Sequence, residues 1–181
     1  MKGEGLRMRK RPLLEPKVAI LMGSDSDIEV MREAEKRLDY FGILYETRIL
    51  SAHRTPQKTH DYASSASKRG IEVIIVGAGA AAHLAGVVAA NTTLPVIGVP
   101  IDSSSLKGLD ALLSTVQMPA GVPVATMAIG KAGAANAGIF AAKIIACKDS
   151  QISAKLEEFK KEMASGVEAK DRKLRAEKHK Q

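Results

Sequence analysis

Three short polar segments of this sequence carry side chains that bind phosphate or move protons. Gly23–Asp27 reads GSDSD, Ser51–Thr55 reads SAHRT, and Gly77–Gly86 reads GAGAAAHLAG. Serine hydroxyls beside a helix N-terminus favour an anion, arginine binds phosphate or carboxylate through two N–H groups, and histidine titrates near neutral pH. These residue types predict a site for a phosphorylated sugar and for proton transfer.

The first segment combines hydroxyls with two carboxylates. Gly23 permits a tight turn, and Ser24 and Ser26 offer hydroxyls to an anion. Two carboxylates beside a phosphate would repel it, so one of them must face away or accept hydrogen bonds from ribose hydroxyls. Asp27, at the start of a predicted helix, is the candidate. Plain capping of that helix by Ser and Asp is the structural alternative.

The second segment places an imidazole beside a guanidinium. His53 and Arg54 follow a predicted strand, and Ser51 and Ala52 leave space for a ligand. Arg54 suits phosphate or carboxylate, and His53 suits acid/base work. The structural alternative is a hydrogen-bonding loop histidine beside a surface arginine.

The third segment places His83 after a run of small residues. Its glycines do not form a dinucleotide fingerprint, because the third glycine is missing at the required offset and no acidic residue ends the next strand. His60 lies inside a predicted helix and His179 in a charged tail, so we interpret both as surface residues. The sequence has neither metal-ligand spacing nor a Walker lysine, and we expect no cofactor and no metal.

Each segment follows an apolar run that predicts a strand, and each is followed by a helical pattern. Continuous apolar strands alternating with helices predict a parallel sheet covered on both faces, a doubly wound three-layer α/β domain resembling flavodoxin. A C-terminal helix, with apolar residues at helical spacing from Ile152 to Met163, follows the last unit. The five predicted strands are 18–22, 45–50, 72–77, 95–100 and 123–129.

The net charge of +7 resides in the two ends of the chain. Residues 1–17 carry +4 and residues 165–181 carry +3, while the charges between them cancel. We predict a basic disordered arm over 1–17, a catalytic domain over 18–165 and a charged tail over 166–181. Solvated tails explain the charge better than a nucleic-acid groove does, because aromatic residues make up 3% of the chain. A role of the tails on RNA or membranes, or the arm as a targeting segment, stays open.

Other features bound the protein class. The single Cys147 excludes an internal disulfide, and no apolar run approaches the roughly 18 residues of a membrane helix, so a cytoplasmic location is expected. The chain has no Trp and three Phe, and it is rich in Ala and Gly over 77–90 and 125–146. The monomer core therefore has few large apolar side chains to bury, and a large interface between identical subunits is predicted.

Together the motifs resemble the PurE family of purine biosynthesis, in particular its class I branch, the N5-carboxyaminoimidazole ribonucleotide (N5-CAIR) mutases. The similarity covers about residues 18–165. The motifs, in chain order, are MGSDSD, SAHRTP, a GAG loop ending in AAHL, LPVIGVP, LLSTVQMP, GVPVAT and AIGKAGAANA.

The resemblance implies an octamer of α/β subunits. It implies a reaction that moves a carboxylate from the exocyclic nitrogen to C4 of an imidazole ribonucleotide, without metal, ATP or biotin. By resemblance, His53 is the acid/base, Ser24 and Asp27 hold the phosphoribosyl group, with Asp27 on the ribose hydroxyls, and Arg54 holds the phosphate. The residues expected to enclose the imidazole and the carboxylate are Ser51, Ala52, Gly79, Ala80, His83 and Leu84.

Three positions depart from the family pattern. Ala80 replaces a glycine, Ala85 a proline and Ala111 a serine. If position 80 needs a positive φ, Ala80 adds strain there. Two alternatives therefore stay open: the class II reaction, in which CO2 carboxylates aminoimidazole ribonucleotide (AIR) directly, and a non-catalytic oligomeric binder of phosphoribosyl ligands. Retention of AAHL, with His83 and Leu84, favours class I.

Overall fold

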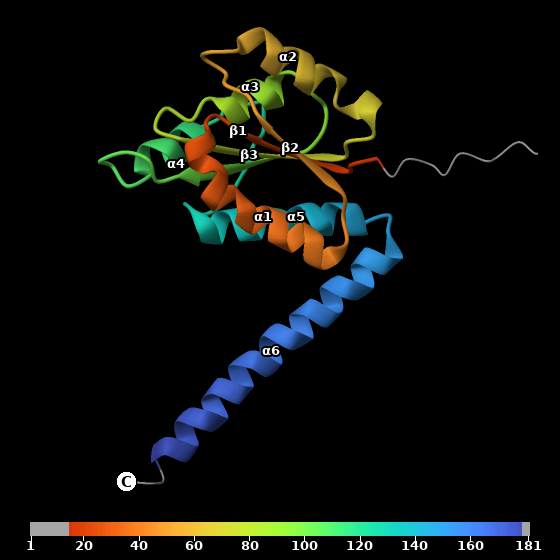
Figure 1. Cartoon of the computed structure of the whole chain (residues 1–181), viewed down its shortest axis with the longest axis vertical. Coiled ribbons are helices and arrows are strands. Elements are labelled where there is room, and N and C mark those ends of the chain that lie inside the picture. The colour runs from red at the N-terminus through yellow and green to blue at the C-terminus, as the bar shows by residue number, and fades with distance from the viewer. Residues whose placement is uncertain (1–14, 179–181) are drawn as a thin grey trace, which may run out of the picture.

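A five-stranded parallel sheet forms the centre of the protein in a computed structural model, which describes residues 15–178 (Figure 1). The strand order is β2-β1-β3-β4-β5, the order of flavodoxin-like folds, so the predicted fold class is confirmed. The strands are β1 (Val18–Met22), β2 (Tyr45–Ile49), β3 (Val73–Gly79), β4 (Val96–Ile101) and β5 (Ala125–Thr126).

The apolar runs became the inner strands because helices cover both faces of the sheet. Every residue of β1 and β4 is buried, whereas β2 lies at one edge and is largely exposed. At the other edge, β5 spans only two residues of the strand predicted over 123–129. Pro123, which has no N–H to donate to a neighbouring strand, precedes it.

The helices form two layers around the sheet. Figure 1 shows α2, α3 and α4 on one side of the sheet and α1 and α5 on the other. The side chains buried between the sheet and each layer form two separate hydrophobic clusters. The predicted end of the first helix is confirmed, since Gly42 caps it with a φ of 71°. The helices of these layers are α1 (Ile28–Phe41), α2 (Pro56–Ser65), α3 (Leu84–Ala90), α4 (Leu109–Val116) and α5 (Lys131–Ala146), with 3-10 turns η1 (Asp25–Asp27) and η2 (Ser67–Arg69).

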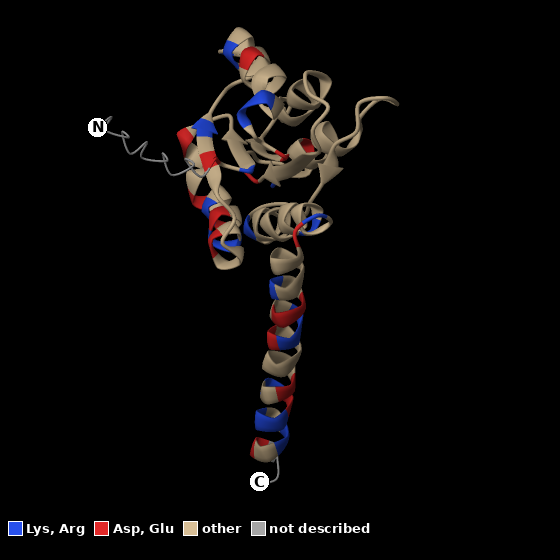
Figure 2. Ribbon diagram, turned by 90° about the vertical axis from the view of Figure 1, so that its right-hand side faces the viewer, with Lys and Arg blue, Asp and Glu red and all other residues tan. Residues whose placement is uncertain are grey.

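The last helix, α6 (Ser150–Lys178), begins on the domain and then extends away from it (Figure 1). Ile152 and Phe159 are buried, and the Phe159 ring meets that of Phe41 edge-on at 5.6 Å. Beyond this contact the helix is exposed, with Lys, Arg, Asp and Glu distributed along it (Figure 2). The segment predicted as a charged tail therefore continues this helix as far as Lys178.

Lys17, which precedes β1, already pairs with the sheet. The Lys17 N–H donates to the carbonyl of Leu44, and its carbonyl accepts from the N–H of Glu72, so Lys17 already joins the sheet. The rest of the predicted arm, apart from Glu15 and Pro16, lies outside the described residues, as does His179. The domain boundaries at 17/18 and 165/166 stay predictions. Within residues 15–178 no helix is long and apolar enough to cross a membrane.

Candidate active site

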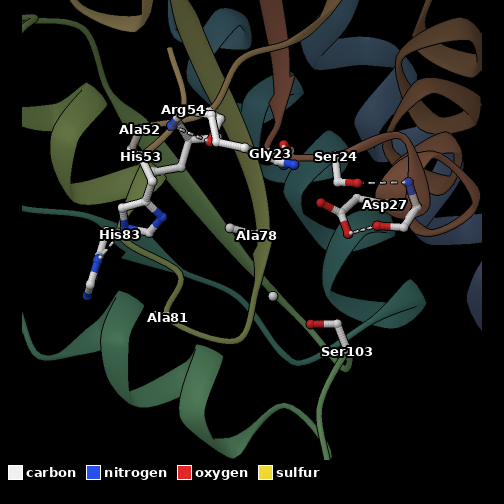
Figure 3. A pocket seen from close by; sticks show the side chains of 14 residues that line it. Gly23, Ser24, Asp27, Ala52, His53, Arg54, Ala78, Ala81, His83 and Ser103 are labelled. Atoms are coloured by element: carbon white, nitrogen blue, oxygen red, sulfur yellow. Dashed lines mark hydrogen bonds between the residues drawn. The ribbon is translucent and has the colours of Figure 1, made fainter. Parts of the chain in front are cut away.

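A cavity of about 350 Å³ opens at the carboxyl ends of the strands, over the point between β1 and β3 where the strand order reverses (Figure 3). Ligands of doubly wound sheets bind at such switch points. The loops after β1, β2, β3 and β4 all contribute to its lining. The lining residues are Gly23, Ser24, Ser26, Asp27, Ser51, Ala52, His53, Arg54, Ala78, Gly79, Ala81, His83, Leu84 and Ser103.

In the first loop, Ser24 and Asp27 differ in whether they cap a helix. The Ser24 hydroxyl accepts from the Ser26 N–H at 3.4 Å and so caps η1. Asp27 precedes α1 but makes no side-chain capping bond, and its carboxylate faces the cavity (Figure 3). Ser24 therefore caps the short turn η1, while the expected alternative, side-chain capping of α1, fails for Asp27.

Asp27 is a buried acid, with a relative exposure of 5%. Burial raises the pKa of its carboxyl, although a hydrogen bond from the Ser26 hydroxyl at 3.3 Å and a bond from the backbone at Ser24 act in the opposite direction. A desolvated carboxylate with acceptor positions left over is suited to the hydroxyls of a ligand.

The second loop is closed on itself and tied to the first. The Arg54 N–H donates to the Ser51 hydroxyl at 3.1 Å, and the Thr55 hydroxyl donates to the Ser51 carbonyl at 3.1 Å. Across the gap between the loops, Nη2 of Arg54 donates to the carbonyl of Gly23 at 2.9 Å. The guanidinium is thereby held at the backbone of the first loop, with N–H donors still available for an anion.

The third loop brings the second histidine to the first. Nε2 of His53 and Nδ1 of His83 lie 2.9 Å apart, and the two rings meet edge-on with their centroids at 5.1 Å (Figure 3). One of these nitrogens must carry the hydrogen and the other must accept it. The structure thus joins two histidines that the sequence separates by 30 positions.

Gly79 and Ala80 in this loop are constrained in different ways, Ala80 by its backbone conformation and Gly79 by the space around it. Ala80 adopts a φ of 51°, so this position does need the left-handed conformation, and the predicted strain is confirmed as a matter of geometry. Ala80 does not line the cavity, in contrast to the expectation that it encloses the ligand. Gly79 is needed for space, since a Cβ there would overlap the Ser103 hydroxyl and lie 2.7 Å from its Cβ.

Of the ten site residues proposed from sequence, nine line this cavity, and Ala80 is the exception. The other five lining residues were not among the proposed site residues: Ala78, Ala81 and Ser103, and also Gly23 and Ser26, which the sequence analysis had named in the first segment. Ser103 was detectable, because it follows a predicted strand at the same edge of the sheet as the other loops.

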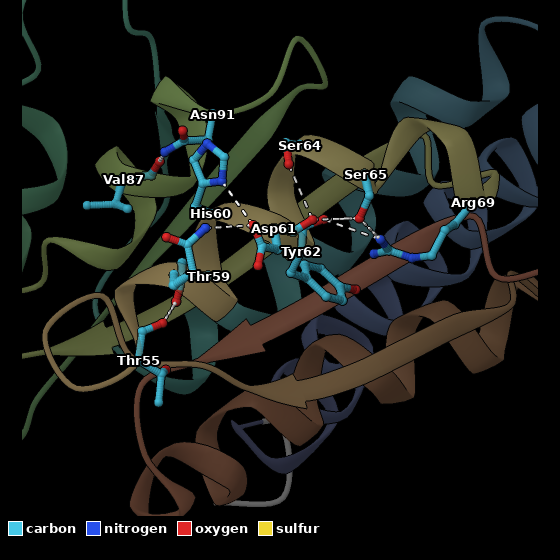
Figure 4. Close-up of polar contacts among 11 residues, drawn as sticks. Thr55, Thr59, His60, Asp61, Tyr62, Ser64, Ser65, Arg69, Val87 and Asn91 are labelled. Carbon is cyan, nitrogen blue, oxygen red and sulfur yellow. Dashed lines mark hydrogen bonds and ion pairs between the residues drawn. The ribbon is translucent and has the colours of Figure 1, made fainter.

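The remaining polar groups lie elsewhere. His60 is exposed on α2, where its Nδ1 lies 3.3 Å from Asp61 Oδ1, within a set of surface contacts that ties α2 to Arg69 (Figure 4). Among residues 15–178, no three His, Cys, Asp or Glu side chains are grouped so as to hold a metal ion.

Comparison with known proteins identifies the family of this chain. The family model described as AIR carboxylase matches residues 17–166. The N5-carboxyaminoimidazole ribonucleotide mutase of Vibrio parahaemolyticus is 60% identical over 151 residues, covering 83% of this chain and 94% of the relative. The mutase of the same name from Pyrococcus horikoshii is 54% identical over 160 residues, covering 88% and 89%.

A solved structure, that of Treponema denticola PurE, superposes with a TM-score of 0.80 at 30% identity, covering 88% of this chain and 98% of that one. Sequence and fold thus agree over nearly the whole length of the relatives. The chain therefore belongs to the AIR carboxylase family.

Proposed function

We propose that this protein is an N5-CAIR mutase, which converts N5-CAIR to 4-carboxy-5-aminoimidazole ribonucleotide (CAIR) in the synthesis of IMP. The observation that carries the proposal is the His53–His83 pair, which shares one cavity with Arg54 and Asp27. An imidazole pair beside a phosphate site and a diol site matches a ribonucleotide whose ring exchanges protons. The relatives that carry this name support the choice of substrate.

The substrate is oriented by its phosphoribosyl group. In this proposal the phosphate lies between Arg54 and Ser24, which line the same cavity and supply a guanidinium and a hydroxyl. The ribose hydroxyls donate to Asp27, which has no capping bond to lose. The imidazole ring is then left with the part of the cavity near His53 and His83.

His53 acts as the acid and then as the base. Its proton assists cleavage of the bond between the exocyclic nitrogen and the carboxylate carbon, which releases CO2 and leaves the amine. The electron-rich ring then attacks CO2 through C4, forming the new C–C bond, and a base removes the C4 proton to restore aromaticity. One imidazole serves both proton steps, and the hydrogen bond to His83 fixes the orientation of its ring.

Retention of CO2 is a matter of proximity. CO2 released beside the ring is held at a high effective concentration as long as the cavity stays closed by substrate. Small side chains in the wall leave room for the CO2 molecule, and no cofactor is needed in this scheme. We propose that the protein works without metal, ATP or biotin.

The test is ultraviolet-monitored conversion of freshly prepared N5-CAIR by wild type, His53→Asn and His60→Asn, without ATP or metal. We expect His53→Asn to lower turnover at least about 100-fold, because general acid/base catalysis contributes about 10² to 10⁴ in rate, and to leave ligand binding intact. His60→Asn, which changes an exposed histidine on α2, should turn over like wild type.

The same assay separates the alternatives. Bicarbonate-dependent CAIR formation from AIR, with little conversion of N5-CAIR, would establish direct carboxylation instead. Ligand binding without any turnover by the wild type would establish a non-catalytic binder, for which the strained Ala80 would be the first suspect. An active His53→Asn variant would contradict the role given to His53.

We further propose that the enzyme is a cytoplasmic homo-octamer that acts on a small molecule and has no nucleic-acid or membrane partner. Support for assembly comes from apolar side chains left exposed on α4, namely Leu109, Leu113 and Val116. A face of this kind on a folded chain is typical of a subunit interface.

A further inference from the structure

Ser103 has a hydroxyl that the folded chain leaves unused. It lies just beyond β4, lines the cavity and points into it (Figure 3). Its neighbour Ser104 behaves differently, since the Ser104 hydroxyl donates to Asp110 Oδ2 at 2.8 Å and accepts from the Leu106 N–H at 3.1 Å. The Ser103 hydroxyl forms no comparable hydrogen bond with any residue of 15–178.

The loop that carries Ser103 is fixed by its own contacts. The bond from Ser104 to Asp110 ties the loop to the first turn of α4, and the bond from the Leu106 N–H to Ser104 closes the loop on itself. Lys107 and Gly108 then adopt positive φ values of 50° and 83°, which turn the chain into that helix. Ser103 is thus presented by a loop with an ordered framework, as a preorganised ligand group should be.

Gly79 makes the room that Ser103 occupies. A side chain at position 79 would overlap the Ser103 hydroxyl and would lie 3.2 Å from the carbonyl of Ile101. The end of β3 and Ser103, two residues beyond β4, therefore fit together because position 79 is glycine. This contact places the hydroxyl at the wall of the cavity that the small-residue loop forms.

The other polar groups of the cavity determine which part of the proposed ligand is left for Ser103 to contact. Arg54, Ser24 and Asp27 are taken up by phosphate and ribose in the proposed binding mode. The rest of the lining consists of small or apolar residues together with His53, His83 and the serines Ser26, Ser51 and Ser103. The Ser26 hydroxyl donates to Asp27, and the Ser51 hydroxyl accepts from the Arg54 N–H. Ser103 is the lining serine whose hydroxyl has no hydrogen-bond partner among residues 15–178.

We propose that the Ser103 hydroxyl donates a hydrogen bond to the carboxylate that the imidazole ring carries. The ring itself offers its edge to the two histidines, and its carboxylate is the remaining acceptor, for which Ser103 supplies a hydroxyl that residues 15–178 leave without a partner. A donor at this point also orients CO2 between its release and its recapture at C4. This inference rests on the proposed function for the identity of the ligands.

Binding measurements test the contact directly, because CAIR carries the carboxylate and AIR lacks it. We expect Ser103→Ala to weaken CAIR about tenfold or more, as removal of a hydrogen bond to a charged group does, and to leave AIR within about twofold. Ser105→Ala is the matched control: it removes the exposed hydroxyl of a serine two positions further along the loop that does not line the cavity. This variant should bind both ligands like wild type.

Turnover supplies the second readout. With N5-CAIR as substrate, Ser103→Ala should release a several-fold larger fraction of AIR and CO2 than wild type does, since poorly held CO2 escapes before recapture. Equal weakening of CAIR and AIR would overturn the contact with the carboxylate, and so would unchanged binding of both. Failure of the wild type to convert N5-CAIR would instead contradict the proposed function, and the ratio of CAIR to AIR affinity would still test Ser103.

Discussion

Asp27 has two properties that oppose each other. Burial raises the pKa of its carboxyl, which means that the folded protein holds the charged form at a cost in stability. The same burial leaves a carboxylate without a capping bond at the wall of the cavity, ready to accept hydrogen bonds from a ligand. Stability and binding therefore favour different residues at this position.

Asp27→Asn tests this conflict. Because the pKa is higher in the folded than in the unfolded state, the contribution of Asp27 to stability is full below the ordinary value of 3.8 and falls as the pH rises through the folded pKa. At pH 7 the variant should therefore unfold at a higher urea concentration than wild type, and the difference should vanish near pH 3. Its affinity for ribose 5-phosphate should fall about tenfold or more.

Asp25→Asn is the control for this pair of measurements, since it changes an exposed carboxylate in the same loop. It should neither raise the urea midpoint nor weaken ribose 5-phosphate. An Asp27→Asn protein that is less stable at pH 7, or that binds ribose 5-phosphate like wild type, would show that the carboxylate is a structural group.

The β3–α3 loop contains a strained backbone conformation at Ala80 and is nevertheless held in one path by its own hydrogen bonds. Ala80 lies at a φ of 51°, and two hydrogen bonds between residues two apart hold the turn, from Ala82 N–H to the Ala80 carbonyl at 2.9 Å and from His83 N–H to the Ala81 carbonyl at 2.8 Å. An L-residue in this conformation costs about 1 kcal/mol or slightly more. The loop nevertheless delivers His83 to His53.

Ala80→Gly should relieve this strain, and Ala81→Gly, at a neighbouring position without a positive φ, should not. Both substitutions raise the conformational entropy of the unfolded chain by the same amount. The difference between their free energies of unfolding therefore measures the strain at Ala80. We expect the free energy of unfolding of Ala80→Gly to exceed that of Ala81→Gly by about 1 kcal/mol. Denaturant titration of the two variants measures it, and equal values would mean that the loop relaxes around Ala80.

At the scale of the whole molecule, two helical surfaces expose large apolar side chains. Leu109, Leu113 and Val116 are each about half exposed on α4, and Met163 and Val167 are exposed where α6 leaves the domain. Apolar stripes on helices are normally buried against another element, and within the described residues these stripes face no such element. Contact between copies of the chain is the arrangement that we propose for them.

Sedimentation tests the proposed assembly. Wild type should sediment as a species much larger than the 19.2-kDa chain, and Leu113→Asp should shift it to a smaller one, because a charge would be buried in the interface. Ser64→Asp, on the exposed face of the polar helix α2, should leave the assembly unchanged. A wild type that stays monomeric at micromolar concentration would refute the assembly.

The sequence by itself determined the α/β class, the order of the elements and nine of the cavity residues. These features depend on short-range information: apolar runs form the buried strands, and polar residues that follow such strands collect at one edge of a parallel sheet. His53 and Arg54 were found for this reason.

Only the tertiary structure decided what depends on contacts between distant segments. The bond between His53 and His83, the burial that raises the pKa of Asp27, and the approach of Ser103 to Gly79 each join parts of the chain that no local pattern relates. The positive φ of Ala80 is also a result of the tertiary structure, because alanine by itself does not favour a left-handed conformation. Local propensity fixes which elements form, whereas packing of the whole chain fixes which side chains meet.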